Sequence, residues 1–341
     1  MTDTHPSDLA RGYPAALGAA VLLSTTAVFI RYLTVTYELP ALVLAFWRDV
    51  FVVLTLVPVL AIARPALLRA ERRHLGYLAD YGLMLAAFNA MWTLSVAFNG
   101  AAVATVLVYC SAAFTALLGW WLLKEKLNWG KLVAIALSIG GCVLVADALD
   151  PDAWDANFAG ILTGVLSGLT YAGYSLMGRA AAQRGLNPWT SLIYTFGFAA
   201  VVLLGVNLLP GEVITGGAVR AGDMFWLGTS WAGWGVQFLL AAGPTVGGFG
   251  LYNVSLSHLP SGVANLIMTL EPAFTAVTAF FFLGERLTLT QAAGGLVIVS
   301  GVVFLRVYQG RTAEEAGTSR QAAKTPGKAE PNNQVGAPQG D

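Results

Sequence analysis

The sequence is poor in charged residues, cysteine and histidine, and each shortage excludes a class of protein. Charged side chains make up only 11% of the 341 residues, whereas soluble domains carry roughly 25%. With 56% hydrophobic residues and a mean hydropathy of +0.66, the chain has too few polar groups to cover a water-facing surface of this size. We therefore expect much of its surface to meet lipid.

Other absences narrow the function. The two cysteines, Cys110 and Cys142, lie in apolar runs, which favours small buried side chains over a disulfide framework or a metal site. The balance of 19 basic and 19 acidic residues leaves no basic face for nucleic acid. Phosphate-loop, HExxH and GxSxG motifs are absent, so we expect no cofactor, no ATPase subunit and no enzyme.

What the chain does contain is ten apolar runs, each near the roughly 20 residues that a helix needs to cross a bilayer. They lie near 14–33, 41–63, 75–98, 101–123, 128–146, 158–179, 188–209, 232–256, 260–283 and 289–308. The sequence therefore predicts an all-α integral membrane protein of ten transmembrane helices, with the lipid bilayer as its main partner. The polar residues 309–341 read as a disordered tail.

The basic residues predict the orientation, because cytoplasmic loops are enriched in lysine and arginine. With the segment 1–13 in the cytoplasm, 15 basic residues fall inside, three outside, and Arg48 within a span. The acidic loop 147–157 then lies outside. Both termini are predicted to be cytoplasmic.

The two halves of the chain repeat each other. A shift of 160 places AAFTA at 112–116 on PAFTA at 272–276 and aligns the loops KEKL and GERL. Over 101–145 the shifted sequence has 11 identities, where chance gives about three. The first two spans need a shift of 148. Five spans per copy is an odd number, so the repeats 14–146 and 158–308 are predicted to lie in opposite orientations.

Inverted repeats are typical of secondary transporters, which bind a small-molecule substrate near the membrane midplane where the repeats meet. Alternating access at that cavity is the function that the pattern favours. A passive channel and, less favoured, a membrane-embedded enzyme remain the alternatives at this point. Saturable flux and counterflow separate a carrier from a pore.

Polar and aromatic residues within the spans are candidates for a substrate cavity or gate. Asn89 and Trp92 share a helix face, as do Tyr252 and Asn253, while Tyr171 and Tyr174 add aromatic surface. Such rings suit amphipathic or aromatic solutes and cations, although Trp and Tyr also form interfacial belts. The candidate set is Ser24, Asn89, Trp92, Tyr109, Tyr171, Tyr174, Tyr252, Asn253, Asn265 and Thr269.

Three charged residues and one proline stand out at membrane depth. Glu271 lies near the middle of its span, where a charge is expensive and is either functional or hydrogen-bonded within the bundle. Pro272 predicts a helix kink that frees the carbonyl of Met268. Arg48 and Asp49 point about 100° apart on a helix, so we expect no simple pair between them.

These residues carry a family resemblance. AFWRDV at 45–50, LEPAFTA at 270–276 and the GERL that follows resemble the EamA family of the drug/metabolite transporter superfamily. Within it the chain is most similar to YddG-type exporters of aromatic amino acids and methyl viologen. The resemblance implies ten spans, both termini inside a bacterial-type inner membrane, and efflux of small metabolites. One departure is that Ser111 stands where the second repeat has Glu271.

Overall fold

A computed structural model describes residues 6–124, 128–146, 151–209, 215–259 and 261–324. These residues form helices and no strand, which confirms the prediction of an all-α protein. The helices are α1 Pro6–Thr36, α2 Ala41–Ala63, α3 Arg72–Asn99, α4 Ala101–Val108, α5 Ser111–Leu123, α6 Trp129–Val145, α7 Pro151–Gln183, α8 Pro188–Asn207, α9 Trp231–Leu240, α10 Gly248–His258, α11 Ser261–Met268, α12 Glu271–Leu283 and α13 Leu289–Lys324. Short 3₁₀ segments η1 Pro65–Leu68 and η2 Ala221–Phe225, and a π segment η3 Ala241–Gly247, join them.

Helices cover every predicted apolar run, and the run 41–63 matches α2 at both ends. Among the residues that the structure describes, five helical segments are long and apolar enough to cross a membrane by length and composition. They are Arg11–Thr36, Ala41–Ala63, Arg72–Asn99, Ala101–Trp121 and Pro188–Asn207. A multi-pass membrane protein follows, whereas the number of ten crossings stays a prediction.

Two of the predicted spans are interrupted at equivalent places. Pro272 lies in the first turn of α12, just after the break between α11 and α12. The break between α4 and α5 contains no proline; it lies at Tyr109 and Cys110, within the predicted apolar run 101–123. There the N–H groups of Tyr109 and Cys110 donate to carbonyls three residues back, at 3.1 Å each, which tightens the turn and ends the regular helix.

The eighth run also departs from a single helix, because it contains the π segment η3. Pro244 has no N–H to donate to the carbonyl of Leu240. The hydroxyl of Thr245 donates to that carbonyl instead, at 3.0 Å. The widened turn therefore follows from a proline whose missing hydrogen bond is replaced by a side chain.

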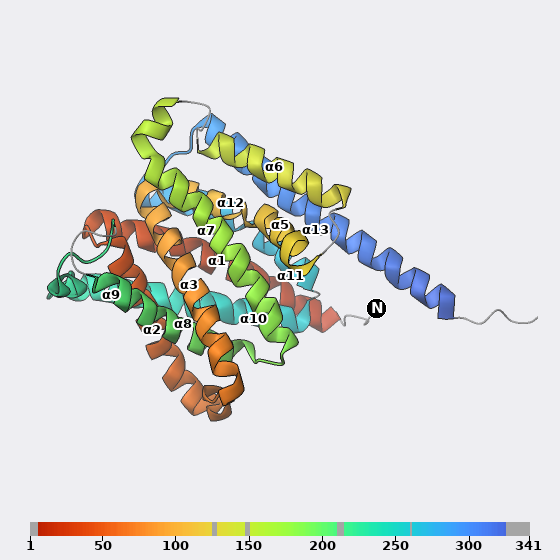
Figure 1. Cartoon of the computed structure of the whole chain (residues 1–341), viewed down its shortest axis with the longest axis horizontal. Coiled ribbons are helices and arrows are strands. Elements are labelled where there is room, and N and C mark those ends of the chain that lie inside the picture. Colours follow the sequence, from red (N-terminus) through yellow and green to blue (C-terminus); the bar gives the residue numbers. More distant parts are fainter. Residues whose placement is uncertain (1–5, 125–127, 147–150, 210–214, 260, 325–341) are drawn as a thin grey trace, which may run out of the picture.

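Contacts between the helices define two bundles, and Figure 1 shows α6 and α13 side by side at the edge of the molecule. The first bundle is α3, α4, α5 and α7; the second bundle is α1, α10, α11 and α12. α2 packs on α8, and α6 packs along α13, where Gly141 and Gly294 bring the two backbones close together. The largest core cluster lies where α1, α3, α4 and α12 meet, and a second lies between α2, α3 and α8.

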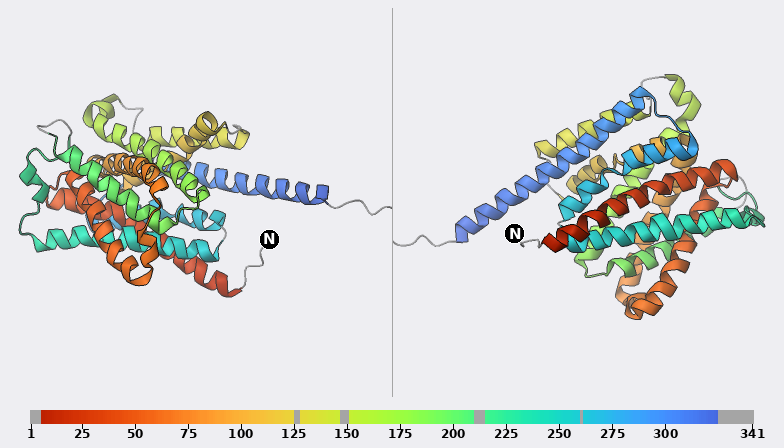
Figure 2. Two further views of the ribbon diagram at one scale, coloured as in Figure 1. Left: turned by 60° about the horizontal axis from the view of Figure 1, so that its bottom comes forward. Right: turned by 180° about the vertical axis from the view of Figure 1, so that it is seen from behind.

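Helices also extend into two segments that were predicted to be irregular. Residues 309–324, predicted to be disordered, continue α13 because Ala, Glu, Arg and Gln are good helix formers; residues 325–341 lie outside the described part. The predicted loop 147–157 is helical from Pro151, with non-helical backbone only at Asn157, and its residues 147–150 lie outside the description. The start of α1 and the end of α13 lie at the same end of the molecule (Figure 2).

Candidate functional site

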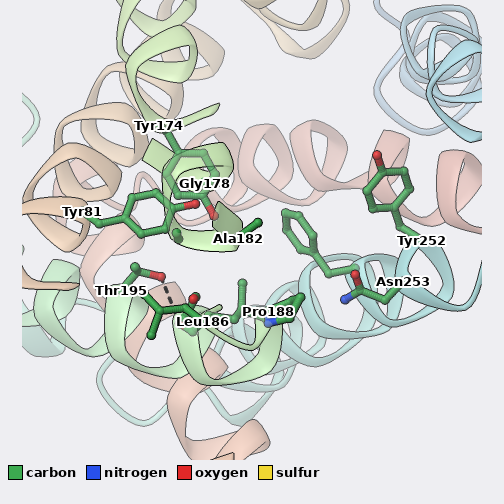
Figure 3. Close-up of a pocket in the computed structure, with 13 residues that line it drawn as sticks. Tyr81, Tyr174, Gly178, Ala182, Leu186, Pro188, Thr195, Tyr252 and Asn253 are labelled. Atoms are coloured by element: carbon green, nitrogen blue, oxygen red, sulfur yellow. Dashed lines mark hydrogen bonds between the residues drawn. The ribbon is translucent and has the colours of Figure 1, made fainter. Parts of the chain in front are cut away.

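A cavity of about 200 Å³ lies where α3, α7, α8 and α10 meet. Figure 3 shows Tyr81 and Tyr174 on one side of it and Tyr252 and Asn253 on the other. Three of the four, all except Tyr81, belong to the set predicted from sequence. The remaining lining residues are Gly178, Ala181, Ala182, Leu186, Pro188, Ser191, Leu192, Thr195 and Phe249.

The cavity has one aromatic wall and one polar wall. The rings of Tyr81 and Tyr174 are 4.8 Å apart. Ser191 and Thr195 lie one turn apart on α8; Thr195 donates to the carbonyl of Leu192 at 3.2 Å, whereas the buried Ser191 hydroxyl has no protein partner. None of the 13 lining residues carries a formal charge. The cavity therefore suits a neutral, amphipathic solute.

A glycine keeps this space open. A Cβ on Gly178 would lie 2.7 Å from the hydroxyl oxygen of Tyr81, so any larger residue there displaces the ring or fills the cavity. Neither Gly178 nor Ser191 was predicted, because the helical spacing of α7 and α8 does not reveal which face meets a cavity.

A buried polar cluster contains Arg48, Asp49 and Asn89. The amide of Asn89 donates to both carboxylate oxygens of Asp49, at 2.8 and 2.9 Å. Arg48 Nε lies 3.7 Å from Asp49 Oδ1, so the expectation that the two residues form no pair was wrong. The long arginine side chain folds back towards its neighbour, which compensates for the 100° between their positions. Asn89, predicted to face the cavity, holds Asp49.

The two helix breaks meet at a second polar cluster. The hydroxyl of Tyr109, at the α4–α5 break, lies 2.9 Å from the carbonyl oxygen of Met268 and 3.1 Å from Glu271 Oε2. The Met268 carbonyl is the acceptor that Pro272 cannot satisfy. Tyr109 on the α4–α5 break therefore replaces the missing backbone hydrogen bond at the α11–α12 break, next to the Glu271 carboxyl.

The other candidates lie outside the lining of this cavity. The Ser24 hydroxyl donates to the carbonyl of Val21 at 2.7 Å, and Trp92 is buried in the largest hydrophobic cluster. Tyr171 is 39% exposed and its ring lies 5.0 Å from that of Phe88. Thr269 is buried at the α11–α12 break. Asn265 lies in α11, but its side chain falls outside the described part of the chain. A substrate role for these residues stays a prediction.

A family model matches both halves of this arrangement. The EamA-like transporter family model aligns with residues 10–146 and again with residues 158–307. The chain belongs to the EamA-like transporter family. The resemblance in the sequence is thus confirmed at the level of the family. Since this family consists of transporters, an enzymatic activity is not implied.

Relatives of this EamA-like transporter carry transporter names. An "uncharacterized transporter" of Archaeoglobus fulgidus is 28% identical over 86% of this chain and 95% of the relative. The threonine/homoserine exporter RhtA of Salmonella typhimurium is 27% identical over 67% of this chain and 70% of the relative. A probable terminal-alkyne amino-acid exporter of Streptantibioticus cattleyicolor is 39% identical over 18% of this chain and 23% of the relative.

A solved crystal structure shares the fold. It superposes with a TM-score of 0.55 and covers 89% of this chain and 98% of its own, at 15% sequence identity. A likeness at this identity supports the architecture of the EamA-like transporter and leaves its substrate open.

Proposed function

We propose that this EamA-like protein is a secondary transporter that exports neutral amino acids by alternating access. The observation that carries the proposal is the uncharged cavity, with its aromatic wall on α3 and α7 and its hydroxyl and amide groups on α8 and α10. Fixed charge of one sign would trap a zwitterion by one end, whereas hydrogen bonds and ring faces bind it without holding it for long.

The size of the cavity favours a small solute. At about 200 Å³ it falls below the roughly 300–1,000 Å³ of sites for drug-sized ligands. Two of the relatives are named as amino-acid exporters, which supports the same class. Aromatic amino acids are included, because the tyrosine rings offer faces for stacking. A cation such as methyl viologen is the second candidate, on the ground that the same faces attract cations.

The contacts support two inverted repeats of five helices. In sequence, α10 of the second repeat corresponds to α3 of the first, and α7 of the second corresponds to α1 of the first. The contacts follow this correspondence, because α3 packs on α7 and α10 packs on α1. A pair of glycines shows the same correspondence. Gly160 on α7 contacts Asn99 at the end of α3. The equivalent residues of the other pair of helices, Gly12 on α1 and Leu259 after α10, are also in contact. The double family match supports it independently.

The same repeats support a topology with ten spans in a bacterial-type inner membrane. Of the 19 basic residues, 15 then lie on the side of both termini, as the positive-inside rule requires of the cytoplasm. The cavity lies near the end of α7, where Arg179 in the helix and Arg184 just after it belong to this side. In this topology the cavity is reached from the cytoplasm, which is the loading side for an exporter.

A transport screen with two glycine variants tests the proposal. Purified protein in proteoliposomes is assayed for uptake across a panel of labelled amino acids. Gly178→Val fills the cavity and is expected to abolish uptake of the preferred solute. Gly197→Val is the matched control, since a Cβ there meets nothing within 4 Å. No uptake of any amino acid by the wild type, or equal uptake by both variants, would refute the proposed function.

A further inference from the structure

The two bundles are joined at one end by a pair of charged residues. Arg31, near the end of α1, and Glu285, after the end of α12, both belong to the second bundle. The Nε of Arg31 lies 3.4 Å from Glu285 Oε1. Both side chains contact the first bundle at the turn between α3 and α4. Arg31 bonds to the end of α3, and Glu285 bonds to the start of α4.

The contacts with that turn are hydrogen bonds to the backbone. Glu285 accepts from the N–H of Ala101 at 3.0 and 2.9 Å and from the N–H of Ala102 at 3.1 Å. These are free donors in the first turn of α4, where the helix dipole also favours a negative charge. Arg31 Nη1 donates to the carbonyl of Ala97 at 2.5 Å. The pair thus satisfies acceptors and donors on both sides of the turn.

The turn is shaped for the carboxylate. Gly100 has a φ of +83°, which glycine adopts without strain. A Cβ at this position would lie 2.8 Å from Glu285 Oε1, so only glycine lets the carboxylate approach the start of α4 so closely. The positive φ and the close approach of Glu285 therefore each require a glycine at position 100.

This contact and the cavity lie at opposite ends of the bundles. α3 and α7 are antiparallel: Asn99 Nδ2 donates to the carbonyl of Gly160 at 2.7 Å at one end, and Tyr77 donates to the carbonyl of Met177 at the other. The turn bound by Glu285 directly follows Asn99, whereas Tyr81 and Gly178 of the cavity lie at the Tyr77 end. Between the two ends, Tyr109 joins the bundles through Met268.

We propose that Arg31 and Glu285 form a clamp that keeps the external end of the transport pathway closed while the cavity is open at the other end. The inference rests on the proposed alternating access and adds the residues that control it. With Tyr109 and Met268 as the contact about which the bundles tilt, release of the clamp lets the bundles separate at the external end. Closure of the cavity accompanies that separation.

Thiol accessibility measures the two ends separately. Cys110 and Cys142 are first replaced by alanine, and a single cysteine is then introduced at Ala104 or at Ala182. Ala104 on α4 is fully buried in the cluster that α1 and α12 share beneath the clamp, and Ala182 lines the cavity. Labelling rates with a maleimide are compared in detergent micelles, where both ends of the protein are accessible, with and without Glu285→Gln.

Glu285→Gln keeps the shape but loses the charge. We expect labelling at Ala104→Cys to rise by about threefold to tenfold, a range set by the weak pairing of part-exposed charges and the stronger hydrogen bonds of a carboxylate. Labelling at Ala182→Cys should fall in parallel. Arg31→Gln should have the same two effects, and Arg286→Gln, which removes the adjacent charge whose guanidinium lies over Phe280, should have neither.

Two labelling results would overturn the clamp. Unchanged labelling at both positions in Glu285→Gln, or a change equal to that of Arg286→Gln, overturns the clamp. A rise at both positions also overturns it, because it reports general loosening of the fold instead of a reciprocal motion. The readout needs no substrate. A clamp that responds as expected in a protein that transports no amino acid would therefore refute the proposed function and leave the clamp intact.

Discussion

Replacing Tyr109 by phenylalanine tests how the broken helices are held together. The substitution removes one oxygen and keeps the ring. That oxygen lies 2.9 Å from the Met268 carbonyl, which Pro272 leaves without its helical donor. Losing the hydroxyl leaves a carbonyl unpaired at membrane depth.

The expected cost follows from two scales. Leaving a buried acceptor unsatisfied costs about 1–3 kcal/mol, whereas hydrogen bonds between membrane helices average about 0.6 kcal/mol in double-mutant cycles. Because the proline removes the usual donor to Met268, we expect a loss of about 1–2 kcal/mol in the free energy of unfolding. Equilibrium unfolding in mixed detergent micelles measures it. Tyr32→Phe, at a ring that is 37% exposed, is the control and should change little.

A second substitution sharpens the test. Pro272→Ala supplies an N–H four residues after Met268, which can donate to the same carbonyl. In that background the cost of Tyr109→Phe should fall to less than half. Strictly additive costs, or a Tyr109→Phe protein as stable as Tyr32→Phe, would refute the reasoning.

Three further predictions follow from other contacts. If Glu271 couples transport to protons, Glu271→Gln should preserve counterflow and abolish accumulation driven by a pH gradient; equal loss of both would indicate a structural role. Asn207→Leu should lower the free energy of unfolding by about 1–3 kcal/mol, because its amide joins α2, α8 and the segment 215–219; unchanged stability would contradict this. Reporter fusions at Arg69 and Asp152 should read cytoplasmic and external respectively, and a cytoplasmic signal at Asp152 would exclude inverted repeats.

Apolar run length and repeat spacing predict most of the helical architecture. The limits of α2 follow from the run 41–63 alone, since a helix in lipid must satisfy its own backbone. The break at Tyr109 was not predicted, because no proline or glycine marks it. Its position is visible only by comparison with the repeat that contains Pro272. The helix over 309–324 was not predicted, because a polar composition indicates disorder even where the residues have a high helix propensity.

The sequence predicted some residues of the candidate site and not others. Spacing on a helix shows that Tyr252 and Asn253 lie close together, and both line the cavity. It does not show which neighbour a face meets. Asn89 was therefore assigned to the cavity although it binds Asp49. Ser191 could not be found from sequence, because a serine in an apolar helix more often bonds to its own backbone.

Counterflow tests the central claim, alternating access to a neutral amino acid, most directly. Proteoliposomes are loaded with an unlabelled amino acid that the transport screen selects, and entry of the labelled form is followed over a range of external concentrations. The account predicts transient accumulation of label above equilibrium and a rate that saturates. Entry that rises linearly with concentration and never exceeds equilibrium would contradict it, because that behaviour is the signature of a pore.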